Sequence, residues 1–319
     1  MTRIRAKRNN PGLRAQHLQA LRSCCHLCSG RLDGDEIGSQ EVVYSPGKRL
    51  HGGDFHWDIG TAGSATMLAL TVIPVALFAD GPSRFSITGG LFQDFAPSGF
   101  HMQKVLIPIV RRMAIESRVE TKIMRPGYVP KGGGQLEIEV TPVSTPLSPL
   151  HMVDQGNVTA IRGISLASHL RKEMVSRRMA EQCEKLLIKQ RCPVDIRVID
   201  DDTSVQKGAA LALWAETDTG CRIGADQAGK PGRRSESIAD FVVRSLLEDL
   251  DSSATTDRHL ADQLILFAAL ASGTTRYLIP GKTDHVESNL WLVNEILGAR
   301  TDLSGSTLTI EGTGFYPSG

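Results

Sequence analysis

Residues 54–88 read DFHWDIGTAGSATMLALTVIPVALFADGPSRFSIT, and this stretch decides the fold class. Residues 54–59 and 84–88 carry the aromatic and β-branched side chains that are typical of strands. Between them, a turn of small residues at 60–64 opens an apolar segment, 65–78, which has the length of a buried helix. The order strand, helix, strand predicts a protein in which sheets and helices pack as layers.

The same alternation continues on both sides of this stretch. We expect helices at 11–30, 168–190, 235–250, 259–271 and 286–297, and one more helix that ends at about residue 115. We expect strands at 41–44, 119–123, 135–140, 158–166, 194–199, 209–216, 221–225 and 276–279, with a closing hairpin around 302–306. The sequence therefore predicts an α+β fold of layered sheets and helices. The region 160–240 has its own complete set of strands and helices, which is the pattern of an inserted domain.

Composition excludes some classes of function. The chain has 319 residues, of which 41% are hydrophobic, and 36 Lys plus Arg face 35 Asp plus Glu. A net charge of +1 argues against a domain that binds duplex DNA by charge alone, so any contact with nucleic acid is local. The apolar run at 65–78 is too short for a membrane span, and the basic start lacks the apolar region of a secretory signal. We expect a cytoplasmic protein without a membrane partner; the sequence carries no sign of its oligomeric state.

The six cysteines follow no disulfide pattern. They stand at uneven spacing, at Cys24, Cys25, Cys28, Cys183, Cys192 and Cys221. Cys25 and Cys28 form one CxxC, but no second pair follows at a zinc-ribbon distance. Helical spacing puts Leu13, His17, Leu21, Cys24 and Cys28 on one face, which favours buried small side chains over a metal site.

Generic motifs of catalysis are absent from the sequence, including the P-loop, G-x-G-x-x-G, G-x-S-x-G and H-E-x-x-H. The chain nevertheless carries a series of short motifs along nearly its whole length, at 5–13 (RAKRNNPGL), 16–18 (QHL), 38–40 (GSQ), 52–54 (GGD), 59–64 (IGTAGS), 79–83 (ADGPS), 127–134 (GYVPKGGG), 161–163 (IRG), 260–263 (LADQ) and 283–285 (TDH). In these segments it resembles the RNA 3'-terminal phosphate cyclases. Each segment alone is weak evidence, but their order and spacing together are specific.

The resemblance implies a fold and an activity. The fold has repeated units of two helices on a four-stranded sheet, with an inserted thioredoxin-like small domain. We place the large domain at 1–158 and 242–319 and the insert at 159–241. The implied enzyme is a ligase that forms phosphoric ester bonds: ATP converts an RNA 3'-terminal phosphate into a 2',3'-cyclic phosphodiester, through a covalent histidine-AMP and an RNA(3')pp(5')A intermediate.

By the resemblance, His285 is the nucleophile that attacks the α-phosphorus of ATP. A free imidazole has a pKa of about 6.5, so it is largely neutral at pH 7 and needs no separate strong base. Without the resemblance, a lone histidine beside a helix start is more often a surface or capping residue.

The resemblance also implies an ATP site made of His259, Leu260, Ala261, Asp262 and Gln263, with Leu70 at a nucleotide-contacting position. Asp262 is the candidate ligand for the divalent ion, Mg²⁺ or Mn²⁺, that screens the triphosphate. The alternative is a helix start at which acidic side chains only complement the helix dipole.

Arg5, Arg8, Gln16 and His17 match positions near the RNA end and its phosphates. Arginine forks suit a terminal phosphate, although a basic amino terminus can simply be solvated. The Lys131 segment, with its three following glycines, offers backbone amides to a phosphate, and a glycine-rich hairpin explains the same residues equally well.

Several positions depart from the family pattern. Leu70 replaces a glutamine, His259 replaces a tyrosine, and the segment 89–93 loses a hydroxyl and an acid. The family also has a G-E-G-G-G-Q-x-x-R segment ahead of residue 1, so we expect either a start further upstream or an impaired enzyme. The second hypothesis is therefore a non-catalytic cyclase-like protein that binds RNA in ribosome biogenesis. An enolpyruvyl-transferase relative would rest on fold analogy alone.

Overall fold

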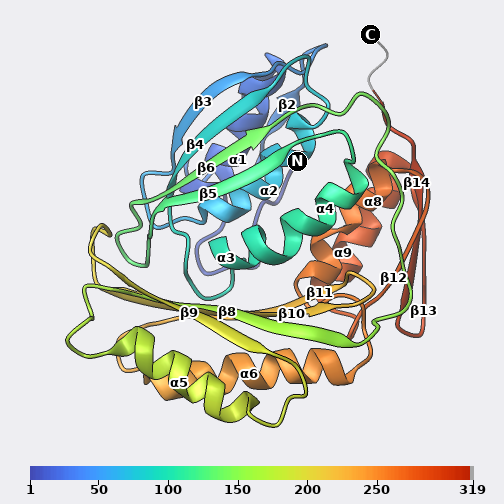
Figure 1. The fold of residues 1–319 in the computed structure, drawn as a ribbon. Helices are drawn as coiled ribbons and strands as arrows, with labels where there is room; N and C mark the ends of the chain where they lie inside the picture. The colour runs from blue at the N-terminus through green and yellow to red at the C-terminus, as the bar shows by residue number, and fades with distance from the viewer. Residues whose placement is uncertain (317–319) are drawn as a thin grey trace. The chain divides into compact units, whose positions relative to one another are not determined.

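The computed structural model describes residues 1–316, and these residues form two compact units. The first unit contains residues 1–91 and 117–142, and the second contains 92–116 and the chain from 143 onward. Each unit combines helices with small sheets (Figure 1), which confirms the predicted α+β class. Within residues 1–316, none of the helices has the length and apolar composition that a membrane crossing requires.

A four-stranded sheet and one buried helix make the centre of the first unit. The sheet order is β3-β4-β6-β5, with β3 and β4 parallel and the other pairs antiparallel. The parallel pair arises because helix α2 crosses over between its two strands, as the stretch 54–88 predicts. The elements are β3 (Gly53–Asp58), α2 (Ala65–Ala76), β4 (Ser83–Gly89), β5 (Val119–Arg125) and β6 (Gly134–Val140).

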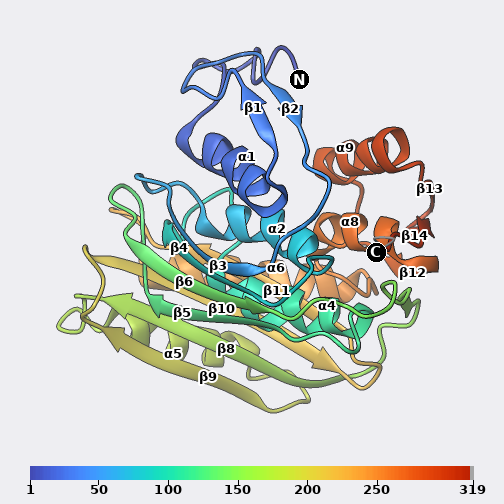
Figure 2. The same cartoon turned by 90° about the horizontal axis from the view of Figure 1, so that it is seen from above.

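Three aromatic rings stack within this sheet. The rings of Phe55, Trp57 and Phe85 have their centroids 5.3 to 5.5 Å apart. Helix α1 (Ala15–Cys28) packs on α2 and lies beside the small ribbon of β1 (Arg31–Asp33) and β2 (Val43–Ser45), as Figure 2 shows. The predicted first helix is confirmed, although it begins four residues after Pro11.

The α1 cysteines are free thiols. Cys25 and Cys28 are buried, and the Cys28 Sγ lies 3.1 Å from the Tyr44 hydroxyl. Burial, followed by the neighbouring thiols, raises the pKa of Cys24 to about 11. The Cys24 thiol therefore stays protonated near neutral pH, which fits a packing side chain better than a metal ligand.

The second unit contains a sheet covered on one face by two helices. Its strand order is β11-β10-β8-β9, and α5 and α6 lie side by side along it (Figure 1). The elements are β8 (Val158–Ser168), α5 (Val175–Leu187), β9 (Val194–Asp201), β10 (Gly208–Thr217), β11 (Arg222–Ala228) and α6 (Ser235–Asp251). Its hydrophobic core runs from Ile161 in β8 to Leu246 in α6. The insert boundaries 159–241 stay a prediction.

The predicted helix at 168–190 is too long at its start. Ser168 instead ends β8, where it pairs with Asp201 of β9, and its hydroxyl donates to the Asp201 carboxylate at 2.7 Å. Sheet pairing therefore continues past the point where the charged sequence favours a helix.

Leu187 in α5 allows a test of this packing. It is fully buried in the core, whereas its neighbour Leu186 is 40% exposed. We expect Leu187→Ala to lower the free energy of unfolding by about 3 kcal/mol, because a buried leucine leaves a cavity behind. Leu186→Ala is the matched control, with an expected loss under about 1 kcal/mol. Urea unfolding of both variants measures the difference; equal losses would contradict this placement of α5.

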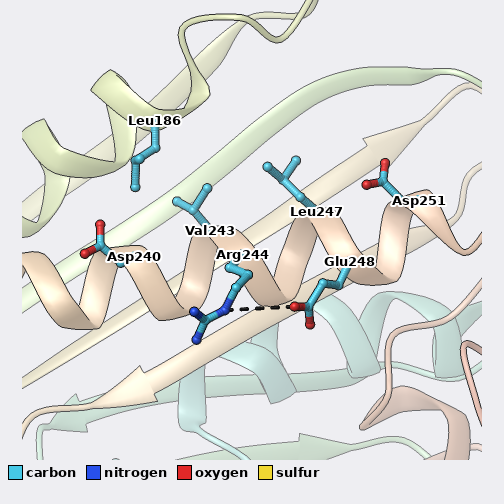
Figure 3. Close-up of a pocket in the computed structure, with 7 residues that line it drawn as sticks. All are labelled: Leu186, Asp240, Val243, Arg244, Leu247, Glu248 and Asp251. Atoms are coloured by element: carbon cyan, nitrogen blue, oxygen red, sulfur yellow. Dashed lines mark ion pairs between the residues drawn. The ribbon is translucent and has the colours of Figure 1, made fainter.

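A shallow cavity of about 440 Å³ opens between α5 and α6. Figure 3 shows Leu186 of α5 across from Val243 and Leu247 of α6, and Arg244 paired to Glu248. Its lining contains none of the predicted site residues; it consists of Leu186, Asp240, Val243, Arg244, Leu247, Glu248 and Asp251.

The second unit also holds a mixed sheet with the order β13-β14-β12-β7. Helix α8 packs on β14, and α9 continues into a π-helical turn, η2. The elements are β7 (His151–Met152), α7 (Leu260–Gln263), α8 (Ile265–Leu270), β12 (Ser272–Leu278), α9 (Asp284–Leu292), η2 (Val293–Leu297), β13 (Arg300–Ser304) and β14 (Thr307–Thr313). The single helix predicted at 259–271 is wrong, because it is two short helices. Pairing with β14 starts the strand at Ser272, earlier than the expected 276.

A helical segment precedes these elements and packs on β11. It consists of α3 (Gly99–His101), the π-helical η1 (Met102–Leu106) and α4 (Ile107–Met113). Pro108 has no N–H, so it cannot donate to the carbonyl of Lys104 one turn earlier. The Arg222 guanidinium donates to that carbonyl at 2.7 Å instead. The bond ties this segment to β11 and holds His101 against that strand.

Candidate active site

His285 lies in the first turn of α9. The Thr283 hydroxyl caps this helix by accepting from the backbone N–H of Val286 at 3.2 Å. Val286 is fully buried and anchors the turn, whereas His285 beside it is exposed. The fold therefore fixes the backbone under the imidazole and leaves the ring accessible to a ligand.

Asp262 in α7 faces two histidines. Its carboxylate is half-buried, and burial raises its pKa, while the nearby imidazoles of His285 and His259 oppose that shift. The Asn289 side chain of α9 donates to the Asp262 carbonyl at 3.3 Å, which holds the two helices together. The structure thus brings His259 and His285 each within electrostatic range of Asp262.

The rest of the predicted ATP segment divides into buried and available groups. The side chains of Leu260 and Ala261 are fully buried, and the Tyr277 hydroxyl donates to the Ala261 carbonyl at 2.8 Å. The N–H groups of Leu260 and Ala261 donate to Asp257, and the Leu260 carbonyl accepts from the Leu264 N–H, so these two residues shape the segment and offer no free group to a ligand. Gln263 differs, because its buried Oε1 has no hydrogen-bond partner within the part of the chain that the structure describes. A buried acceptor of this kind calls for a donor.

Asp257 organises the start of this segment. Its fully buried carboxylate accepts from the backbone N–H groups of His259 and Leu260, both at 2.8 Å. On its other oxygen it accepts from the Gly224 N–H at 2.9 Å and from the His101 imidazole at 3.0 Å. The alternative raised from the sequence, acidic side chains at a helix start, therefore describes Asp257, and Asp262 also lies in the first turn of α7.

Asp257 and His101 form a buried ion pair. Burial alone would raise the pKa of the Asp257 carboxyl, but the facing His101 and the N–H donors hold it well below its usual range. Burial also disfavours the His101 imidazolium, but the Asp257 carboxylate outweighs this and raises the pKa of His101 to about 9. The His259 ring meets the His101 ring edge to face, with 6.0 Å between centroids.

The predicted phosphate-binding arginines lie in the first unit. Arg5 and Arg8 line a cavity of about 370 Å³ whose lining contains no acidic side chain, namely Arg5, Lys7, Arg8, Asn9, Asn10 and Arg14. The Arg5 guanidinium already donates to the carbonyls of Asn10 at 2.9 Å and Gly12 at 3.1 Å. Arg5 therefore shapes the loop, and Arg8 is the more available cation.

Gln16 and His17 have structural partners on α1. The Gln16 side chain accepts from the Ser64 N–H at 3.1 Å and so joins α1 to the start of α2. The His17 Nδ1 accepts from the Arg14 N–H at 3.2 Å. Burial, followed by Arg5 and Arg14, lowers the pKa of His17, which favours a neutral ring. Leu70 lies half-buried in α2 and does not line the basic cavity.

Gly132 and Gly133 lie in the hairpin loop between β5 and β6, and Gly134 is the first residue of β6. Gly132 has a φ of +71°, and a side chain there would come within 2.8 Å of the Thr61 carbonyl. The hairpin interpretation therefore explains a glycine at this position.

Sequence comparison gives the family. The family model for RNA 3'-terminal phosphate cyclase matches residues 1–303. The RNA 3'-terminal phosphate cyclase of Methanothermobacter thermautotrophicus is 36% identical over 302 residues, which cover 95% of this chain and 87% of that protein. The chain belongs to the RNA 3'-terminal phosphate cyclase family. The cyclase of the same name from Pseudomonas fluorescens is 35% identical, over 94% of this chain and 84% of its own length.

Membership in the cyclase family confirms the resemblance drawn from the motifs, and with it the prediction of an enzyme. Among solved structures, EPSP synthase from Acinetobacter baumannii aligns over 93% of this chain and 57% of its own, at 11% identity. Its TM-score of 0.21 is too low to bear on the fold or function of the cyclase.

Proposed function

We propose that the chain uses ATP to convert an RNA 3'-terminal phosphate into a 2',3'-cyclic phosphodiester. In the first step, an imidazole nitrogen of His285 attacks the α-phosphorus and a P–N bond forms. The bond between the α-phosphorus and the oxygen that bridges to the β-phosphorus breaks, and pyrophosphate leaves with that oxygen. The observation that carries this proposal is the exposed His285 ring on α9, a helix that is bonded to the Asp262 carbonyl through Asn289 and that brings the ring within electrostatic range of the Asp262 carboxylate. The unpartnered Gln263 amide would bind a polar group of the nucleotide.

Two further transfers complete the proposed reaction. An oxygen of the RNA 3'-phosphate attacks the AMP phosphorus, the P–N bond breaks, and RNA(3')pp(5')A leaves the imidazole free. The adjacent 2'-hydroxyl then attacks the 3'-phosphorus, loses its proton and displaces AMP. Because deoxyribose lacks this hydroxyl, ring closure requires RNA, whereas a DNA 3'-phosphate would stop at the adenylylated stage.

The divalent ion expected with ATP fits Asp262. No group of three or more His, Cys, Asp or Glu side chains within residues 1–316 forms a metal cage, so the protein alone offers a partial site. Mg²⁺ commonly binds one or two carboxylates together with substrate phosphates, and Mn²⁺ accepts the same oxygen ligands. A bound ion would neutralise triphosphate charge, and Asp262 is the residue that would hold it.

We propose that the acid-free cavity around Arg8 binds the terminal phosphate of the RNA. Arg8→Ala is expected to weaken binding of a 3'-phosphorylated RNA by about 10- to 100-fold, since a hydrogen bond to a charged group contributes roughly 1.5–3 kcal/mol. RNA with a 3'-hydroxyl should lose much less. Arg84→Ala, on an exposed strand position paired with Glu139, is the control. Fluorescence anisotropy with both RNAs measures the effect; an equal loss for the two RNAs would contradict phosphate recognition.

The decisive experiment follows label from ATP. Protein is incubated with α-labelled ATP, Mg²⁺ or Mn²⁺, and a 3'-phosphorylated RNA. We expect acid-labile label on the protein and a cyclic phosphate on the RNA. RNA binding without label or product would favour the non-catalytic cyclase-like hypothesis instead. We also propose that the protein acts in the cytoplasm.

A further inference from the structure

A buried ion pair lies directly behind the proposed nucleotide site. His101 is 2% exposed and Asp257 is not exposed at all, and their nearest atoms are 3.0 Å apart. Neither residue takes part in the proposed chemistry. The pair is nevertheless the point at which three separate elements meet, because His101 comes from α3, Gly224 from β11, and Asp257 from the chain just before α7.

The pair controls the backbone that carries Asp262 and Gln263. One Asp257 oxygen takes the N–H groups of His259 and Leu260, so it fixes the first turn of α7. The other oxygen is fixed by His101 and Gly224. Hydrogen bonds of Thr255 with Met152 and Leu278 hold the chain just upstream, at 2.7 and 2.8 Å.

Stability is a weak reason for such a pair. Two buried ions lose their hydration, and their mutual attraction often repays only part of that loss. The His101 Nδ1 is also buried without a hydrogen-bond partner among the described residues, which adds to the cost. A charged pair that restricts geometry is better explained by what it positions. The His259 ring contacts the His101 ring, and the α7 backbone donates to Asp257 through the Leu260 N–H. Both belong to the proposed nucleotide segment.

Resting on the proposed function, we infer that His101 and Asp257 are positioning residues for ATP. Their ion pair sets the conformation of residues 257–263, so that His259, Asp262 and Gln263 meet the nucleotide together. The effect reaches ATP only through these residues, and the RNA end is bound independently.

Gly224 offers a second way to disturb the pair without touching its charges. A side chain at Gly224 would come within 2.7 Å of Val105 and 3.0 Å of the His101 ring. Gly224→Ala therefore places a methyl group of β11 against the His101 imidazole. His101→Gln instead replaces the imidazole by a neutral side chain that can still donate a hydrogen bond. The matched controls are Gly81→Ala, where a side chain meets open space, and His169→Gln, whose ring contacts the Ser204 carbonyl elsewhere.

The full-length protein is tested by two readouts. Hydrogen exchange of the amides in 258–264 is expected to quicken at least fivefold in His101→Gln and Gly224→Ala, and to stay unchanged in both controls. The apparent KM for ATP in covalent labelling should rise about tenfold, while the rate at saturating ATP falls less than threefold and RNA affinity is unchanged. A merely structural role would lower the amount of active protein and leave the KM as it was.

Each outcome decides a separate point. Unchanged exchange and an unchanged KM for ATP in both variants would overturn the inference. If His101→Gln does not fold, Gly224→Ala carries the same comparison. Wild-type protein that takes no label from ATP contradicts the proposed function alone, because the exchange readout needs no activity and still decides whether the pair holds the segment.

Discussion

Replacing His285 by alanine is expected to abolish the transfer of AMP to the protein. The loss should reach about a thousandfold or more in labelling rate, because the proposal assigns the attacking nitrogen to His285 and gives His259 only a nucleotide-binding role. The ring is exposed, so the variant should fold normally, with a melting temperature within about 2 °C of wild type. Label retained on the gel after denaturation gives the measurement.

The comparison needs a histidine that is exposed but uninvolved. His151 in β7 lies on the exposed edge strand of the second unit and serves this purpose as His151→Ala. It should label like wild type. With RNA present, His285→Ala should transfer no AMP to the RNA. It should nevertheless close the ring on RNA that already bears the 3'-adenylate, because that step uses the 2'-hydroxyl. Undiminished labelling of His285→Ala would refute the assignment of the nucleophile.

Local pattern predicted most of the fold. The stretch 54–88 is strand, helix and strand as expected, because apolar length and small-residue turns act over a few residues. The errors have non-local causes. The helix start near 168 was displaced by pairing of Ser168 with Asp201, 33 residues away, and the strand expected from 276 begins at Ser272 because that residue pairs with Thr313. Charge and apolar spacing carry no information about either partner.

The candidate site, like the fold, could be predicted from the sequence only in part. Motif resemblance pointed to His285, Asp262 and His259, and the structure places each of the two histidines in electrostatic range of Asp262. It gave no sign of His101, which lies in the three-residue helix α3, or of its bond to Asp257. The two residues are 156 positions apart, so no periodicity connects them. A buried polar pair is visible only once β11 and the helices have assembled around it.

Asp257 should therefore be the residue whose loss costs the most stability. Asp257→Ala removes the acceptor for the imidazolium of His101 and for three backbone N–H groups, all of them in the interior. Leaving a buried charge without its partner costs about 3–5 kcal/mol. Asp251→Ala, an exposed carboxylate at the end of α6, is the control and should change little.

The pH dependence of this loss follows from the two pKa shifts. Folding raises the pKa of His101 from 6.5 to about 9, so its contribution is complete below pH 6.5 and is lost as the pH rises through 9. Folding lowers the pKa of Asp257 from 3.8, so its contribution is present above pH 3.8 and is lost as the pH falls through the lower folded value. Both describe one interaction, which is strongest between about pH 4 and 6.5.

Urea unfolding of wild type and Asp257→Ala across this range tests the prediction. The gap between their free energies of unfolding should be widest near pH 5 to 6 and should narrow steadily toward pH 9, as the wild-type His101 loses its proton. Asp257→Ala lacks the carboxylate that raises the pKa of His101, so the free energy of unfolding of this variant should change less between pH 7 and 9. A gap that stays constant from pH 5 to 10 would show that the pair is uncharged in the folded protein, and the buried ion pair would have to be replaced by a neutral hydrogen bond.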